Sequence, residues 1–315
     1  MSEQYDGVLL LNKLRGISSH DAVVMVRRAI KQRSIGHTGT LDPLAEGLLV
    51  LCLGRSTRLS QFISDCDKCY EAEITLGIRS ETGDAEGVSP NETSLDISHI
   101  TPYQISEVLG SFRGEITQQV PLYSAVRVDG ERLYKSARRG ETVERPSRQV
   151  CIHKLQLLGH EENRLFIFVR CSKGTYIRSL AVDIGEKLGC GAYLSGLKRS
   201  HVGMLSLSKS VNLSEIRALH QDKLLQGRLL SAEDVLHFGA ITIHDTFLSR
   251  VANGVVPLPQ DIAEINCVFS TGERILLQSQ SGKALAVAKA NYSSEDLMRL
   301  PGTTNAILSY ERVLS

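Results

Sequence analysis

Apolar and polar side chains alternate along residues 70–78, and few structures are compatible with this pattern. The apolar members are Tyr70, Ala72, Ile74, Leu76 and Ile78, and the polar residues Glu71, Glu73 and Thr75 separate them. A helix would spread these apolar side chains around its axis, whereas a strand gathers them on one face. The segment is therefore predicted to be a strand with one buried face.

Other patterns predict strands and helices on both sides of this segment. Short apolar or alternating runs that indicate strands cover residues 6–12, 48–53, 150–158 and 165–171. Apolar residues at helical spacing cover residues 22–30, behind the cap residues Ser18 and Ser19, and residues 177–188, which Gly189 ends. Residues 80–98 are acidic and contain Gly, Pro and Ser, which is typical of an exposed loop.

The pattern changes near residue 240. Short β-like runs separated by glycine-containing turns follow, over residues 241–243, 267–269, 273–278 and 284–288. The length of 315 residues also favours two domains, at roughly 100 to 200 residues each. We therefore expect one domain over residues 1–238 and a small all-β domain over residues 239–315.

Composition argues against several classes of protein. No apolar run is long enough to cross a membrane, and the first residues do not resemble a secretory signal, so we expect a cytoplasmic protein. The seven cysteines are expected to be free thiols, because they are odd in number and no export signal precedes them. Cys66 and Cys69 form one close pair without a second pair of ligands, so we expect no metal site.

Charge is unevenly distributed along the chain. The net charge is only +1, yet residues 111–210 carry 17 basic and 9 acidic side chains, while residues 67–110 carry 2 and 9. A strongly basic segment in a near-neutral protein is typical of a polyanion binder, although charge counts alone are equally compatible with a solvated surface.

Two loops contain candidate functional residues. Asp42 and His37 lie in a turn-rich segment at residues 36–43, where local spacing alone favours a structural role for both. Residues 171–178 join a predicted strand to a helix and contain Lys173 and Arg178, which suits an anion. The glycine motifs that bind nucleoside triphosphates or dinucleotides are missing, which argues against those ligands. Taken alone, Tyr70 is more often a core aromatic than a stacking platform.

The order of these motifs along the chain closely resembles the bacterial TruB-type tRNA pseudouridine synthases. The matching motifs are Gly36-His37-Thr38-Gly39-Thr40-Leu41-Asp42-Pro43-Leu44-Ala45, Lys68-Cys69-Tyr70, Tyr123-Ser124-Ala125, Lys173-Gly174-Thr175-Tyr176-Ile177-Arg178 and Leu197-Lys198-Arg199. The resemblance implies a mixed α/β (α+β) catalytic domain of the pseudouridine synthase fold, with a central antiparallel mixed sheet flanked by helices. It also implies a basic RNA-binding insertion at about residues 112–150 and a C-terminal PUA-like β-barrel that binds RNA.

The reaction implied by the resemblance converts uridine 55 in the T-loop of tRNA to pseudouridine, without a cofactor or a metal. Asp42 matches the catalytic aspartate, Tyr70 the tyrosine that stacks on the base and is placed to take a proton, and Arg178 the arginine that pairs with the aspartate. Leu197 matches an apolar wall and His37 a residue that helps to hold the flipped-out nucleotide. Lys13 and Tyr176 match positions near the site. Substrate phosphates are expected to meet basic residues of the insertion, among them Arg127, Arg138 and Arg139.

The chemistry is consistent with these roles but leaves alternatives. Breaking the bond between C1′ and N1 and rejoining the uracil through C5 needs a carboxylate, which acts as a nucleophile at the sugar or as a base toward it. The sequence does not distinguish these two roles of Asp42. A tRNA-binding or tRNA-folding protein without turnover is a second hypothesis, and a hydrolytic N-glycosylase is a third. We expect a monomer with tRNA as its partner.

Overall fold

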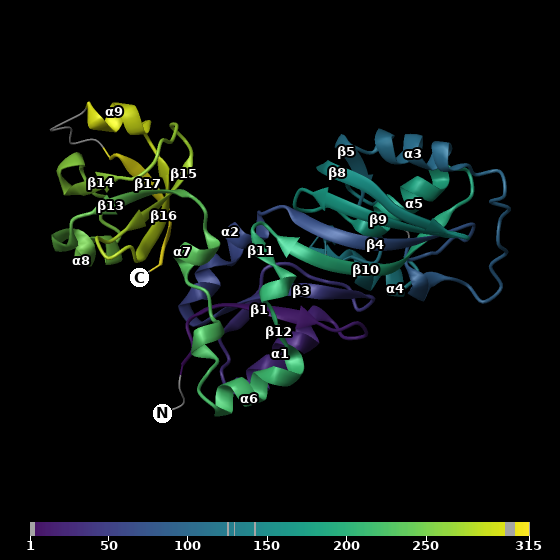
Figure 1. Ribbon diagram of the computed structural model, residues 1–315, viewed down its shortest axis with the longest axis horizontal. Coiled ribbons are helices and arrows are strands. Elements are labelled where there is room, and N and C mark those ends of the chain that lie inside the picture. The colour runs from purple at the N-terminus through teal and green to yellow at the C-terminus, as the bar shows by residue number, and fades with distance from the viewer. Residues whose placement is uncertain (1–3, 125, 129, 142, 300–305, 315) are drawn as a thin grey trace.

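The described chain contains a large sheet, a smaller C-terminal sheet that lies at the other end of the molecule (Figure 1) and one separate two-stranded sheet. The computed structural model describes residues 4–299 and 306–314 apart from residues 125, 129 and 142, and it leaves out the side chains of Arg138 and Met298. Ten strands of the described chain form the larger sheet, and five form the smaller one.

The larger sheet has the strand order β12-β1-β3-β10-β4-β9-β8-β5, with β2 and β11 paired to β3 and β10. Its strands are β1 (Gly7–Lys13), β2 (Ile35–His37), β3 (Ala45–Leu53), β4 (Lys68–Leu76), β5 (Gly114–Gln119), β8 (Ser147–Glu161), β9 (Arg164–Cys171), β10 (Ala192–Val202), β11 (Leu205–Ser206) and β12 (Val211–Asn212). Neighbours are antiparallel except for the pairs β1·β12 and β3·β10. The predicted strands at 6–12, 48–53, 70–78, 150–158 and 165–171 are all confirmed.

Strand β10 lies between β3 and β4 and joins two halves of this sheet. It runs parallel to β3, with Leu197 beside Ala45, and antiparallel to β4, with Arg199 beside Tyr70. Directly opposed residues of an antiparallel pair point to the same face. This register therefore brings Arg199 and Tyr70 together.

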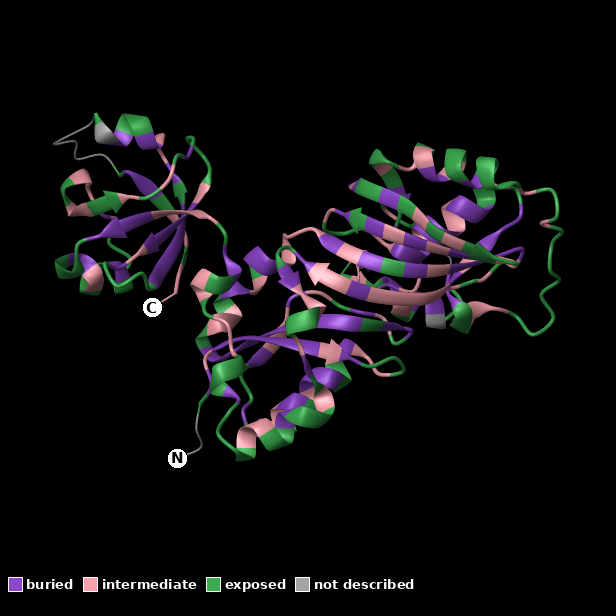
Figure 2. Cartoon of the chain, viewed as in Figure 1, coloured by how far each residue is buried: buried purple, intermediate pink, exposed green. Residues whose placement is uncertain are grey.

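Helices cover one face of the larger sheet, where Figure 2 shows buried residues on the strands beneath them. The covering helices are α1 (Ser19–Ile30), α3 (Pro102–Ser111), α5 (Ile177–Lys187) and α6 (Ile216–Gln221). Helix α1 begins after Ser18, whose side chain forms a reciprocal capping box with Asp21, so the predicted cap is confirmed. Helix α5 confirms the helix predicted over 177–188.

The C-terminal sheet has the order β14-β13-β15-β16-β17 and its own apolar core. Its strands are β13 (Gly239–Ile243), β14 (Ile262–Ile265), β15 (Arg274–Gln278), β16 (Ala284–Ala290) and β17 (Leu308–Val313). The strand predicted over residues 267–269 is wrong. The chain leaves the sheet after Asn266, whose N–H donates to the carbonyl of Ala240, and Phe269 then turns into the core. No pairing among the described strands joins β14 to β17, so a closed PUA-like barrel stays a prediction.

Residues 120–146, between β5 and β8, lie outside the larger sheet and form a small separate unit. We call this unit the insertion. It contains β6 (Arg127–Val128), β7 (Glu131–Arg132) and α4 (Leu133–Arg138). Within the range expected for it, 112–150, residues 114–119 and 147–150 belong to the larger sheet instead, because β5 pairs with the start of β8. No helix among the described residues is long and apolar enough to cross a membrane.

Candidate active site

A cavity of about 610 Å³ lies beside the loop at residues 36–43, and several of the predicted site residues line it. Its walls come from that loop, β4, β10, the start of α5 and two loops that lie far apart in the sequence. Five predicted residues line it, namely Asp42, Tyr70, Tyr176, Arg178 and Leu197. Ligand pockets in proteins commonly have volumes of about 300 to 1,000 Å³, so the cavity can admit a nucleotide.

Asp42 is held in place by backbone contacts of its loop. The hydroxyl of Ser19, the first residue of α1, accepts from the N–H of Leu41 at 2.7 Å and donates to its carbonyl oxygen at 2.9 Å. The carbonyl of Asp42 then accepts from the N–H of Ala45 at 3.0 Å, where β3 begins. Because α1 and β3 fix both ends of this turn, the carboxylate faces the cavity from a rigid support.

The expected partner of this carboxylate is present. Nε of Arg178 lies 2.9 Å from Oδ2 of Asp42, and the arginine side chain is 5% exposed while that of Asp42 is 39% exposed. The N–H of Nε is not aligned with the oxygen, so the contact is an ion pair rather than a directed hydrogen bond. The carboxylate therefore keeps an open side toward the cavity.

Arg178 is fixed by groups that the sequence analysis missed. Its Nη1 and Nη2 donate to the carbonyl oxygens of Thr82 and Tyr123 at 3.0 and 2.9 Å, and Nη1 lies 3.6 Å from the buried carboxylate of Asp84. Asp84 in turn accepts from the hydroxyl of Thr82 and the N–H of Glu86. The guanidinium thus lies between two carboxylates, one of them facing the cavity.

Asp84 belongs to the acidic segment that we expected to be an exposed loop. Much of residues 80–98 is exposed, but Gly83 and Asp84 are buried against the site. An Asp in such a segment has no sequence pattern that separates it from its solvated neighbours. Only the three-dimensional contact with Arg178 identifies it.

Tyr70 and Arg199 form a buried pair on neighbouring strands. Burial raises the pKa of the Tyr70 hydroxyl, while the hydrogen-bonded Arg199 guanidinium acts in the opposite direction. Arg199 is 2% exposed and donates to the carbonyl oxygens of Leu48 and Gly39 at 2.7 and 3.0 Å. It therefore ties β3 and the Asp42 loop to Tyr70. The phenol stays protonated at neutral pH and presents its ring to the cavity.

Lys13 and His37 lie behind the cavity wall and are not among the residues that line it. Lys13 is fully buried, and its Nζ donates to the carbonyl oxygens of Leu14 and Ile17. Burial lowers its pKa to about 8, against the attraction of Asp42. Burial also lowers the pKa of His37, and within the described chain its Nδ1 has no hydrogen-bond partner.

The segment at residues 172–178 forms one wall of the cavity. Gln118 on β5 holds it by exchanging two hydrogen bonds with the backbone of Tyr176, and the Arg148 guanidinium lies 5.2 Å from the centre of the Tyr176 ring. The aromatic face of Tyr176 is thereby set at the cavity edge beside a cation. Such an arrangement suits a base or a phosphate of RNA.

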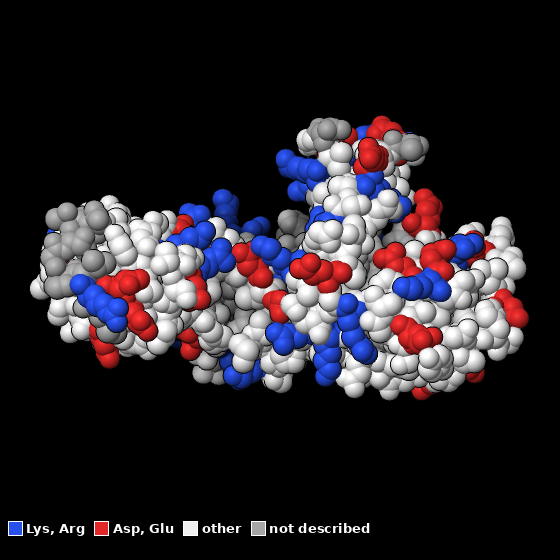
Figure 3. All heavy atoms as spheres, turned by 90° about the horizontal axis from the view of Figure 1, so that it is seen from above, with Lys and Arg blue, Asp and Glu red and all other residues white. Residues whose placement is uncertain are grey.

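The predicted phosphate-binding arginines of the insertion are not equivalent. Arg127 and Arg132 are exposed and lie opposite each other on β6 and β7. Arg139 instead pairs with Glu131 at 2.5 Å and Glu141 at 2.7 Å. The side chain of Arg138 lies outside the described residues. On the face shown in Figure 3, Lys and Arg gather over the middle of the molecule.

A metal-ion centre is not evident in the described part of the chain, where no three His, Cys, Asp or Glu side chains are grouped to hold one. Several of the side chains that line the cavity can take part in a reaction. These include the accessible carboxylate of Asp42, the buried guanidinium groups of Arg178 and Arg199, the phenol of Tyr70 and the apolar side chain of Leu197.

Comparison with known protein families shows to which family the chain belongs. Residues 27–177 match the family model described as TruB family pseudouridylate synthase, N-terminal domain, and residues 178–237 match that of the tRNA pseudouridylate synthase B C-terminal domain. The tRNA pseudouridine synthase B of Bacillus pumilus is 38% identical over 301 residues, which is 93% of this chain and 96% of that protein. The chain belongs to the TruB family of pseudouridylate synthases.

Other relatives and solved structures agree with this family. The tRNA pseudouridine synthase B of Cupriavidus metallidurans is 42% identical over 286 residues, covering 90% of each chain. A chain of a Cbf5-Nop10-Gar1 complex superposes with a TM-score of 0.77 at 24% identity, over 98% of this chain and 85% of that one. At this identity the likeness shows the fold, and it confirms the predicted pseudouridine synthase fold of the TruB-family chain.

Proposed function

We propose that this TruB-family protein isomerises uridine 55 in the T-loop of tRNA to pseudouridine, with Asp42 as the reacting carboxylate. The observation that carries the proposal is the Asp42–Arg178 ion pair at the cavity, 2.9 Å long and open on one side of the carboxylate. The names of the relatives, tRNA pseudouridine synthase B, support tRNA as the substrate.

The side chains divide the work of the reaction in a physically reasonable way. A base inside a folded loop cannot reach the cavity, so the nucleotide must be flipped out, and the Tyr70 ring replaces part of the lost stacking, worth about 1–3 kcal/mol. Asp42 attacks the sugar or removes a proton from it, and either step requires the carboxylate in its ionised form. Arg178 pairs with this carboxylate and orients it.

Retention of the detached uracil follows from the walls of the cavity. Tyr70 and Leu197 both line it, and Tyr70 is 8% exposed. Apolar walls leave the planar base free to turn while they keep it from bulk water. We further propose that the enzyme is a monomer.

The outer parts of the molecule are proposed to bind the remaining tRNA. The insertion contacts phosphates of the T-stem-loop through exposed basic residues such as Arg127, since phosphate contacts fix position without reading sequence. The C-terminal unit, residues 239–315, acts as a PUA-like RNA-binding domain. Its separate sheet and separate apolar core support that division of the chain.

The test is release of tritium from C5-labelled uridine in an unmodified tRNA transcript, because rejoining through C5 expels that hydrogen. The native protein is expected to release tritium, and Asp42→Asn is expected to bind the T-loop but release none. Binding without release by both proteins would support a tRNA-binding protein instead. Appearance of free uracil would support an N-glycosylase.

A further inference from the structure

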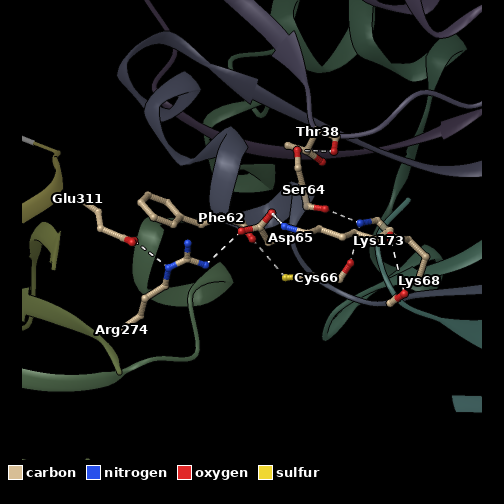
Figure 4. A network of polar contacts seen from close by, with 10 residues as sticks. Thr38, Phe62, Ser64, Asp65, Cys66, Lys68, Lys173, Arg274 and Glu311 are labelled. Atoms are coloured by element: carbon tan, nitrogen blue, oxygen red, sulfur yellow. Dashed lines mark hydrogen bonds and ion pairs between the residues drawn. The ribbon is translucent and has the colours of Figure 1, made fainter. Parts of the chain in front are cut away.

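A short turn, residues 64–68, connects the cavity to the C-terminal sheet. It links α2 (Ser60–Ser64) to β4. Figure 4 shows that its polar groups reach in two directions, toward the C-terminal sheet on one side and toward the cavity walls on the other. Asp65 lies at the centre of these contacts.

On the C-terminal side, Asp65 contacts β15. Nη1 of Arg274 lies 3.2 Å from its Oδ2, while Nε of the same arginine lies 2.8 Å from Glu311 on β17. The guanidinium also lies 5.4 Å from the centre of the Phe62 ring on α2. Three partners therefore define the direction of one arginine, which makes this pair more ordered than an ordinary surface ion pair.

On the cavity side, the turn supports two walls. Nζ of Lys173 lies 2.6 Å from Oδ1 of Asp65, and Lys173 belongs to the wall that continues into Arg178. The hydroxyl of Ser64 donates to the carbonyl of Thr38 at 2.6 Å, in the loop that carries Asp42. Nζ of the buried Lys68 closes the turn on the carbonyls of Ser64 and Cys66.

Each carboxylate oxygen of Asp65 thus contacts one cation. Oδ1 contacts Lys173 on the cavity side, and Oδ2 contacts Arg274 on the C-terminal side. Burial acts to raise the pKa of Asp65, but the hydrogen bonds from Lys173 and Arg274 outweigh it and lower the pKa. An apolar cluster that includes Phe62, Leu276 and Val287 already packs the C-terminal sheet against the catalytic part. Loss of the Asp65 contacts should therefore leave the two parts docked and alter only their fine alignment.

We propose that Asp65 is a positioning residue for the isomerisation, which fixes the 172–178 wall relative to the C-terminal sheet through Lys173 and Arg274. This inference rests on the proposed function. Its physical basis is that the Lys173 segment leads directly into Arg178, the partner of Asp42. A misplacement of about 1 Å, caused by a change far from the reacting atoms, can slow a reaction about a hundredfold.

The test measures single-turnover tritium release and equilibrium binding of the same tRNA transcript separately. Asp65→Asn is expected to lower the single-turnover rate constant about tenfold and to change Kd less than about threefold. Asp65→Glu should restore most of the rate, because its carboxylate can still reach both cations. The matched control is Asp67→Asn, which removes the same charge two residues away, where Asp67 contacts His153 and Arg170.

A second variant separates positioning from folding. Arg274→Ala removes the C-terminal partner of Asp65, together with the arginine's contacts to Glu311 and Phe62, and leaves the Asp65–Lys173 pair in place. It should also slow turnover, and adding it to Asp65→Asn should slow the reaction no further, since both act through one network. Equal rates for Asp65→Asn and Asp67→Asn, or an effect on Kd alone, would overturn the inference. If Asp65→Asn fails to fold, an unchanged single-turnover rate in Arg274→Ala would overturn the inference. Lack of release by the native protein would refute the proposed function instead.

Discussion

Four buried cations surround the site, and their charge is balanced by few carboxylates. Lys13, Lys68, Arg178 and Arg199 are each at most 8% exposed, whereas the carboxylate of Asp42, which pairs with Arg178, is 39% exposed. Charges taken out of water interact strongly, so this arrangement favours an anionic group in the cavity. An incoming nucleotide, with its phosphate, therefore meets an attractive field around a single reactive carboxylate.

Burial of Lys13 should make the stability of the folded protein depend on pH. Its pKa is about 8 in the folded protein, against an ordinary value of 10.5. Between these two values the unfolded chain holds a proton that the folded chain has lost, so the free energy of unfolding should rise with pH. Chemical denaturation from pH 7 to 10.5 should show this rise relative to Lys13→Met, up to about 3 kcal/mol. If the two proteins differed in free energy of unfolding by the same amount at every pH, the burial of a charged amine would be contradicted.

The sequence was informative about residues that belong to motifs and silent about their supports. Asp42, Tyr70 and Arg178 could be named because their motifs occur in a fixed order, and the structure brings all three to one cavity. Asp84 and Asp65 could not, since each is an ordinary Asp in a polar segment whose partner lies about a hundred residues away. Only the folded structure brings these two residues to their partners and so shows that they support the site.

At the scale of elements, the close pairing of β3 with β10 sets the base of the cavity. Gly47 has a φ of +97° and lies beside Arg199, where a Cβ would be only 2.5 Å from the Arg199 carbonyl oxygen. Neither backbone can move without disturbing the buried guanidinium. Glycine is required there by both conformation and space.

Gly47→Ala is therefore expected to destabilise the protein by about 3 kcal/mol, through a strained backbone and a clash with a backbone atom. It should also slow turnover, because Arg199 would shift. Gly110→Ala is the matched control, since this helical glycine on α3 has open space around it, and it should gain about 0.5–1 kcal/mol. Urea unfolding of both variants measures the difference, and equal stabilities would refute the argument.

Elements were predicted well where periodicity was long and poorly where it was short. The alternating strand and the capped helices are confirmed because burial of one face enforces their period. Residues 267–269 looked like a strand, but their apolar character reflects the burial of Phe269 in the core rather than pairing. The strand β17 was missed, since its mixed polar sequence shows no clear alternation.

At the scale of the whole molecule, the exposed charge decides how tRNA is held. Ion pairing separates the exposed arginines of the insertion, because Arg139 is engaged by Glu131 and Glu141 while no ion pair with another described residue holds Arg127 or Arg132. A phosphate that contacts Arg139 must first displace those carboxylates. Counting basic residues along the sequence could not reveal this difference.

The double variant Arg127→Gln/Arg132→Gln should weaken tRNA binding and reduce the slope of log K against log salt concentration by about 1–2, because fewer counterions are released. Arg139→Gln should change that slope less. Single-turnover release from bound tRNA should remain close to native in both. Filter binding over a range of salt concentrations checks the slopes, and a larger effect from Arg139→Gln would contradict the assignment.

The position of β10 has a consequence for biosynthesis. This strand, residues 192–202, is made long after the strands on either side of it, β3 and β4. A nascent chain that has reached only residue 190 therefore holds two half-sheets with unpaired edges, and it lacks Leu197 and Arg199. Pairings between such distant segments form slowly. The cavity can appear only when β10 has left the ribosome and inserted, and until then the two unpaired edges leave the nascent chain open to aggregation.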